Sequence, residues 1–266
     1  MTKILPKDLT SYDFLKSVAI ILMIVDHVGY YFFPDELWFR VVGRMCVPIW
    51  FFLIGYARSR DIGAKLWGGV AVLVLANVAL GQFLMPVNIL ATILVIRMVL
   101  DGFMRRALVR RNTFWAMNVI LFFLIIPSSF IVEYGTLGLV LAIFGFVLRQ
   151  HEGEITATSL PVQYGLFAFV SFVTMQSLNF GMSGTYMQAF LMGAAIVFLV
   201  LFMFAPRTFP RLTKYTPWPL AALIRLTGRR TLEIYVLHLL AFMAVRASLN
   251  PDQWTWFGVK LIYGVG

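Results

Sequence analysis

The chain has 266 residues, of which 61% are hydrophobic and 13% charged, and its formal net charge is +10. One soluble core cannot bury this much apolar surface, so the composition excludes an ordinary soluble protein and indicates an integral membrane protein. A basic balance in so apolar a chain is typical of loop charge that sets membrane orientation, so nucleic acid is not an expected partner. The single cysteine, Cys46, excludes an intrachain disulfide.

About nine stretches have the length of a membrane-spanning helix, which needs roughly 20 mostly apolar residues. In chain order they cover 12–33, 37–57, 64–85, 88–104, 112–131, 134–150, 161–180, 185–204 and 229–247. The expected fold is therefore all-α, a polytopic membrane helical bundle that forms a single domain over residues 1–266. The tail 254–266 is apolar but too short to span, and both an interfacial segment and a further, incomplete helix fit it.

Lysine and arginine positions predict the orientation of this bundle. If all the stretches cross the membrane, most of the 22 basic residues lie in loops on the side of the N-terminus. By the positive-inside rule, that side is cytoplasmic, and the protein is expected in the inner (cytoplasmic) membrane as a multi-pass protein. A few basic residues instead lie within apolar stretches or at their outer ends, namely Arg40, Arg44, Arg97, Arg246 and Lys260.

An acid and an imidazole interrupt the first apolar stretch, "FLKSVAIILMIVDHVGYYFF", at Asp26 and His27. At about 1.5 Å of rise per residue, His27 lies roughly 20 Å from Phe14, in the outer half of the helix. Arg40 and Arg44 share a face of the second stretch, and Arg44 reaches a similar depth. Ionisable groups at such depth are costly unless they face a partner or a cavity. We therefore expect Asp26, His27 and Arg44 to meet in one polar pocket.

Lys16 precedes His27 by about three helical turns, so the two side chains share a stripe that is able to line a passage. A snorkelling lysine that only fixes topology is the alternative interpretation. Other polar residues are expected in the same zone: Asn88, Glu133, Tyr134, Tyr235 and His238. For His238, a helix-packing role explains the residue equally well. No metal site is predicted, because the 3 histidines come from distant segments.

The segments "DFLKSVAIILMIVDHVGYYF" and "ELWFRVVGRMCVPIWFFLIGYARSR" resemble the TraX family of membrane proteins, which is similar to acyltransferase family 3 of the transmembrane acyltransferase superfamily. The likeness continues in "NIL" at 88–90, in "YGTLGLVL" from Tyr134 and in the last predicted helix. Its most specific residues are Lys16, Asp26, His27, Gly43, Arg44 and Pro48. Family 3 has an arginine where this chain has Lys16, a change that keeps the charge but loses the bidentate fork for phosphate.

The resemblance implies an acyltransferase, namely an acetyl-CoA-dependent N- or O-acetyltransferase without a metal. Acetyl-CoA would arrive from the cytoplasm as the acyl donor, and the acceptor would be an extracytoplasmic peptide, glycan or lipid-linked molecule. His27 would act as a general base or a transient acyl carrier. Arg44 would stabilise an oxyanion or bind phosphate, and Asp26 would orient a catalytic group or only neutralise Arg44.

The remaining expected roles are in binding. Lys16, Arg40, Arg58 and Arg60 are the expected contacts of the acyl donor's phosphates. The expected substrate-binding residues are Asn88, Glu133, Tyr134, Tyr235 and His238. The same polar groups also fit a transporter or flippase that binds substrate or relays protons, and a scaffold whose polar residues only join helices. Paired halves with matching interrupted helices, which many transporters have, are not seen in the sequence.

Overall fold

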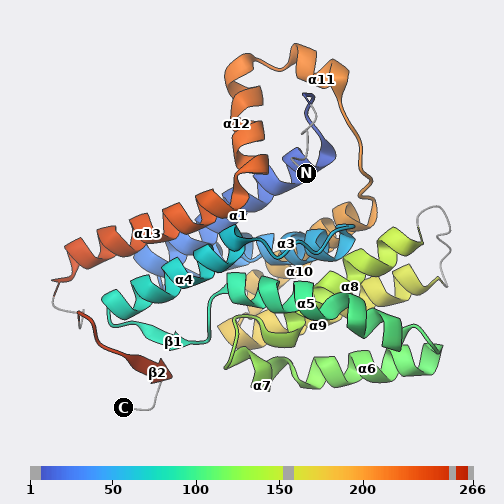
Figure 1. Cartoon of the computed structure of the whole chain (residues 1–266), viewed down its shortest axis with the longest axis horizontal. Coiled ribbons are helices and arrows are strands. Elements are labelled where there is room, and N and C mark those ends of the chain that lie inside the picture. The colour runs from blue at the N-terminus through green and yellow to red at the C-terminus, as the bar shows by residue number, and fades with distance from the viewer. Residues whose placement is uncertain (1–6, 152–158, 252–255, 263–266) are drawn as a thin grey trace.

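The computed structural model describes residues 7–151, 159–251 and 256–262 (Figure 1). Within these ranges regular structure is helical apart from two short strands, which confirms the predicted all-α class. The helices are α1 (Ser11–Phe32), α2 (Leu37–Gly43), α3 (Cys46–Tyr56), α4 (Ala64–Ala79), α5 (Ile89–Ala107), α6 (Arg111–Phe123), α7 (Ile125–Ser129), α8 (Gly135–Gln150), α9 (Leu160–Phe180), α10 (Gly184–Phe202), α11 (Pro210–Tyr215), α12 (Trp218–Arg229) and α13 (Thr231–Leu249). The strands are β1 (Phe83–Met85) and β2 (Lys260–Ile262).

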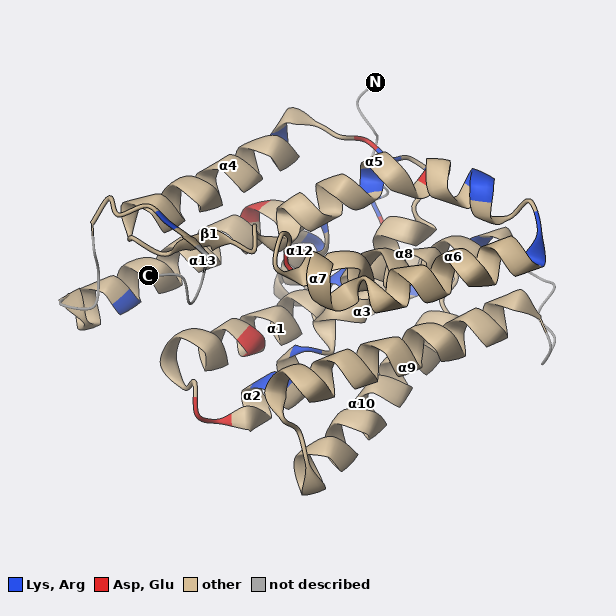
Figure 2. Cartoon of the chain, turned by 90° about the horizontal axis from the view of Figure 1, so that it is seen from below, with Lys and Arg blue, Asp and Glu red and all other residues tan. Residues whose placement is uncertain are grey.

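Apolar helices give the chain the character of a membrane protein. Among the described residues, 4 helical segments are long and apolar enough to cross a bilayer: Ser11–Phe32, Leu37–Tyr56, Gly184–Phe202 and Thr231–Leu249. Ala64–Ala79 and Gly135–Gln150 are shorter apolar helices. Each predicted stretch contains helical structure, and Figure 2 shows charged positions mainly at helix ends and connections.

The second predicted helix is broken between α2 and α3. Pro48 has no N–H to donate to the carbonyl of Arg44, and its ring crowds that carbonyl, so the regular helical hydrogen bonding is interrupted at this point. Val47 instead donates its N–H to the Arg44 carbonyl at 3.1 Å, a tighter turn. The break leaves Arg44 at the carboxyl end of α2.

Three other predicted elements differ from the structure. Helix α4 ends at Ala79 rather than at 85, because the chain turns and enters β1, which pairs in parallel with β2. Residues 260–262 of the apolar tail are therefore a strand and not part of a further helix, while 254, 255 and 263–266 lie outside the described residues. The stretch 112–131 divides into α6 and α7. Helices α11 and α12, in the basic connection before α13, were not predicted.

Helices α3 and α8 form the centre of the bundle. A Cβ atom at Gly55 would lie 1.6 Å from the Ala142 carbonyl oxygen, and one at Gly145 would lie 2.1 Å from that of Phe52. The two backbones are thus in direct contact, which only glycine allows. Residues of α8 are buried along most of its length. Helix α1 packs against α2, α3, α12 and α13 around this centre.

The position of α1 is fixed at its amino end by an ion pair. Arg229 of α12 donates to Asp13 through Nε to Oδ1 at 3.0 Å and through Nη2 to Oδ2 at 3.1 Å. Asp13 also completes a capping box with Thr10, which begins the helix. Figure 1 shows α12 standing at a steep angle to α1 and α13. This contact sets where the polar residues of α1 lie relative to their neighbours.

Candidate functional site

Two cavities meet at His27. The first, here called the Lys16 cavity, has a volume of about 300 Å³. Most of the side chains that line it are apolar, and Lys16 and Arg97 are its basic lining residues. The second, the Arg246 cavity, has a volume of about 400 Å³ and a more polar lining that includes Arg246. Both cavities are lined by Asp26, His27, Glu133 and Tyr235. These four residues form a wall that the two cavities share.

Asp26 is held between the two arginines of the second predicted helix. Its Oδ1 lies 3.0 Å from Arg40 Nη1 and 3.2 Å from Arg44 Nε. Asp26 and Arg40 are buried at 4% and 9% exposure, so these charges depend on one another for neutralisation. The close approach requires Gly43, whose Cβ, if present, would lie 2.4 Å from the Asp26 Cα. In Figure 2 the charged positions of α1 and α2 lie next to each other.

Arg44 also reaches a tyrosine from a distant part of the chain. Its Nη1 donates to the hydroxyl of Tyr134, and its guanidinium carbon lies 4.9 Å from the ring centroid of Phe180. Tyr134 precedes α8 with φ of 67°, in the left-handed region that a tyrosine rarely adopts. Gly135 follows with φ of 49°, so the chain turns sharply here and directs the hydroxyl to Arg44.

His27 and His238 form a hydrogen-bonded pair between α1 and α13. His238 Nε2 lies 3.0 Å from His27 Nδ1, and His238 Nδ1 lies 2.9 Å from the Ile234 carbonyl oxygen. A carbonyl only accepts, so the neutral His238 carries its proton on Nδ1 and presents Nε2 as an acceptor. His27 then donates from Nδ1. This assigns the lone pair of His27 to Nε2, for which no partner exists among the described residues.

Glu133 fixes the start of α5 beside the site. Its Oε2 accepts the Ile89 N–H at 3.0 Å, and its own carbonyl accepts the Thr92 hydroxyl at 2.5 Å. A carboxylate at a helix amino end is favoured by the exposed N–H groups there. Asn88, the residue before α5, lines neither cavity, and its Nδ2 lies 3.5 Å from the Val70 carbonyl oxygen. Asn88 therefore lies next to the site rather than in it.

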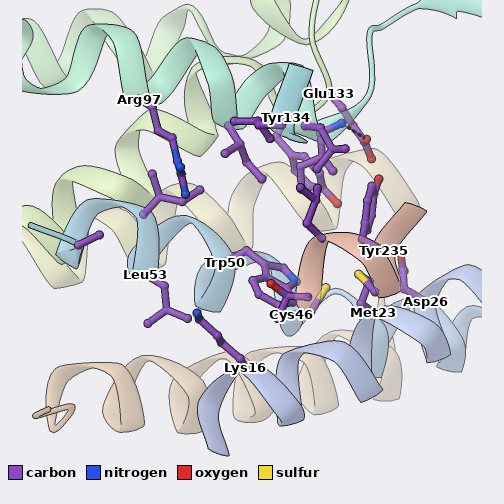
Figure 3. A pocket seen from close by; sticks show the side chains of 18 of the residues that line it. Lys16, Met23, Asp26, Cys46, Trp50, Leu53, Arg97, Glu133, Tyr134 and Tyr235 are labelled. Atoms are coloured by element: carbon purple, nitrogen blue, oxygen red, sulfur yellow. Dashed lines mark hydrogen bonds between the residues drawn. The ribbon is translucent and has the colours of Figure 1, made fainter. Parts of the chain in front are cut away.

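Basic side chains lie at one end of the Lys16 cavity. Figure 3 shows Lys16 and Arg97 directed into the cavity, with Glu133, Tyr235 and Asp26 at the opposite end. Arg97 Nη1 also donates to the Asp61 carbonyl at 2.5 Å. Between the two ends, Trp50 places a buried indole N–H that has no hydrogen-bond partner among the described residues. Such an unpaired N–H is able to donate a hydrogen bond to the carbonyl oxygen of a ligand.

The remaining expected donor-binding arginines are separated from Lys16. Arg40 lines the Arg246 cavity, with Asp26 as its partner. Arg60 caps the carboxyl end of α3 by donating to the carbonyls of Ile54 and Gly55 at 2.9 and 3.1 Å. Burial lowers the pKa of its guanidinium, although the charge of Asp101 opposes this effect. Arg58 is exposed and lines neither cavity. The expected contact of these arginines with the donor stays a prediction. Of the four expected donor-binding residues, Lys16 alone lines the Lys16 cavity.

The sequence of this chain matches a known family over most of its length. The model of the TraX protein family matches residues 11–246. The chain belongs to the TraX family. It is also 31% identical over 155 residues to an uncharacterised protein of Rickettsia prowazekii (strain Madrid E), a match that covers 56% of this chain and 60% of that protein. This chain thus aligns with less than two thirds of the relative's length. No solved structure matches it.

The range matched by the TraX model includes His27, His238, Arg44, Tyr134 and Arg246. Sequence reasoning placed His27, Asp26 and Arg44 together, and all three line the Arg246 cavity. It placed neither Arg246 nor Arg97 in a binding site, although a cation inside an apolar stretch was the available signal. It also missed Trp50, which looks like any other apolar core residue until its unpaired N–H is seen.

Proposed function

We propose that this TraX-family protein is a membrane acyltransferase related to acyltransferase family 3, and that it moves an acetyl group from acetyl-CoA to an extracytoplasmic amine or hydroxyl. The proposal includes about nine crossings of the cytoplasmic membrane and a cytoplasmic N-terminus. In this topology the Lys16 cavity opens to the cytoplasm, and the Arg246 cavity opens to the opposite side. The observation that carries the proposal is that the two cavities share His27.

The Lys16 cavity suits the donor. The pantetheine arm of coenzyme A is a slender chain of methylene and amide groups that ends in the thioester, and phosphates lie at its other end. Lys16 and Arg97 are cations at the end of the cavity away from Asp26 and Tyr235, where those phosphates would lie. Trp50 lines the apolar section between, and its buried N–H has no partner among the described residues, so an amide carbonyl of the arm would be its hydrogen-bond acceptor. The thioester would then lie beside His27.

In the proposed reaction His27 acts as a general base. Its Nε2 takes the proton of the acceptor's amine or hydroxyl while the acceptor nitrogen or oxygen bonds to the thioester carbonyl carbon. The carbonyl oxygen gains negative charge, which the Arg44 guanidinium would stabilise from the Arg246 cavity. The carbon–sulfur bond then breaks, and the coenzyme A thiolate receives the proton from His27. His238 holds His27 in the tautomer that this step requires.

The test is acetyl transfer by the purified protein in nanodiscs, measured with labelled acetyl-CoA. His27→Gln keeps a similar volume but removes the base, so we expect the rate to fall by about 10²- to 10⁴-fold. The matched control is His151→Gln, because His151 lies at the end of α8 and lines neither cavity. Equal rates in the two variants would exclude His27 as the base.

A transporter is the second candidate, because two cavities that meet at a polar layer also resemble the halves of a substrate pathway. The two functions differ in what they consume. A transporter moves a labelled lipid or glycan across sealed vesicles without thioester cleavage, whereas the acyltransferase releases free coenzyme A. Measuring both products in the same vesicles decides between them.

A further inference from the structure

We infer that the acceptor carries an anionic group, a phosphate or a carboxylate, which Arg246 binds at a distance from the reacting atom. This inference rests on the proposed function, and it adds the chemical class of the acceptor. It begins from the charges that line the Arg246 cavity, which are Asp26, Arg40, Arg44, Glu133 and Arg246. Three are basic and two are acidic, so the cavity has one cation in excess.

The excess charge lies on Arg246 itself. Arg40 and Arg44 both contact Asp26, and the Glu133 carboxylate lies on the same shared wall, where it accepts the Ile89 N–H. Arg246 is half-buried in the last turn of α13 and makes no ion pair or hydrogen bond with its side chain among the described residues. An unneutralised guanidinium in an apolar bundle is costly, and a ligand's anion would remove that cost.

The position of Arg246 sets the shape of the acceptor. The residues Tyr235, Leu239, Met243 and Arg246 of α13 all line the cavity, so they form one stripe. Arg246 is three turns, or about 16 Å of helix rise, beyond Tyr235, which lies at the shared wall. The acceptor's nucleophile is therefore expected near His27 and its anion further out. Tyr30, Asn77 and Gln82 add neutral hydrogen-bonding groups to the cavity wall, which suits a polar chain of sugar or peptide units between the two.

Arginines near helix ends also extend to lipid phosphates. A lipid headgroup is therefore the alternative anionic partner of Arg246. Arg246 differs from such residues because its side chain lines a cavity that reaches His27. The experiment must therefore separate a soluble anionic ligand from an anionic lipid headgroup. Nanodiscs made of phosphatidylcholine alone, or with phosphatidylglycerol added, provide the two environments.

The probes are two matched pairs that differ in charge. One pair is the peptide amides Ala-Gly-Gly-Asp and Ala-Gly-Gly-Asn, and the other is glucosamine 6-phosphate and glucosamine. Equilibrium dialysis measures the binding of each probe to the wild-type protein and to Arg246→Gln and Arg246→Lys. Lys260→Gln is the control, because it removes a charge in β2, which pairs with the cavity-lining β1, while Lys260 does not line the cavity.

In phosphatidylcholine, we expect at least one anionic probe to bind the wild-type protein about tenfold more tightly than its neutral partner, the effect of one charge-assisted contact. Arg246→Gln should remove this preference, whereas Arg246→Lys and Lys260→Gln should retain it. Equal binding of the partners, no binding of any probe, or a preference that survives Arg246→Gln overturns the inference. So does a preference that phosphatidylglycerol abolishes, because the lipid is then the ligand.

Acetyl transfer to the same probes is measured in parallel. Transfer without a charge preference retains the proposed function and overturns only the inference. Charge-selective binding that depends on Arg246, without transfer or coenzyme A release, supports the anion site and contradicts the acyltransferase.

Discussion

Gly43→Ala tests whether the spacing between α1 and α2 holds the site together. An alanine Cβ at this position would lie 2.4 Å from the Asp26 Cα and Cβ, whereas ordinary contact begins at 3.4 Å. Helix α2 must therefore move by about 1 Å, the difference of these two distances. The shift carries Arg40 and Arg44 away from Asp26, which they now approach to 3.0 and 3.2 Å.

The expected cost has two parts. Overpacking of this kind destabilises the folded state by about 1–3 kcal/mol, which lowers the melting temperature of a chain of this size by about 2–12 °C. A misplacement of about 1 Å at a reacting site lowers a rate by about 10²-fold. We therefore expect a modest loss of thermal stability together with a large loss of acetyl transfer.

The measurements are the melting temperature in detergent and acetyl transfer in nanodiscs. The matched control is Gly68→Ala, because a Cβ at Gly68 in α4 meets nothing within 4 Å. That substitution should be neutral or slightly stabilising, since alanine is favoured over glycine inside a helix. If both variants have the same melting temperature and the same activity, close approach at Gly43 does not position the arginines and our description of the site is wrong.

Two further substitutions test other buried contacts. Asp26→Asn leaves two buried guanidiniums without their carboxylate, so we expect a loss of about 3–5 kcal/mol in unfolding free energy. The control is Asp101→Asn, which should lose under about 1 kcal/mol because the Asp101 carboxylate is 56% exposed. Denaturant unfolding measures both losses. Tyr164→Phe removes the hydroxyl that donates to Asn118 Oδ1 at 2.7 Å, so the melting temperature should fall by the equivalent of about 1–3 kcal/mol while acetyl transfer stays unchanged. A loss of transfer would show that this contact influences the site.

Helix positions were largely predictable because apolar stretches of spanning length have few alternative structures. What the hydropathy pattern does not contain is where a helix breaks. Pro48 carried that signal for the turn after α2, but a proline in the first turn of a new helix and one within a continuous helix look alike in sequence. Residues 83–85 looked like the end of a helix because their pairing partner, 260–262, is far away in the chain.

The sequence predicted which residues gather at the candidate site, but it did not predict which side chains contact one another there. The free-energy cost of an ionisable group inside the membrane predicted that His27, Asp26 and Arg44 lie together, because each needs a polar environment at the same depth. The partner of His27 depends on how α1 and α13 are rotated against each other, and the sequence left His238 with a packing role as an equal alternative. The left-handed conformation of Tyr134 was also unpredictable, because a tyrosine rarely adopts it and its partner Arg44 lies far away in the sequence.

The shared wall of the two cavities has a consequence for the permeability of the bilayer. If the two cavities open to opposite sides of the membrane, as in the proposed topology, the barrier between the two aqueous compartments narrows at this place to the side chains of Asp26, His27, Glu133 and Tyr235. Water that enters from both sides would need to displace only this layer to make a continuous proton-conducting file. The same residues would therefore protect the cell's electrochemical gradient, and truncating them would be toxic to an energised cell through leakage.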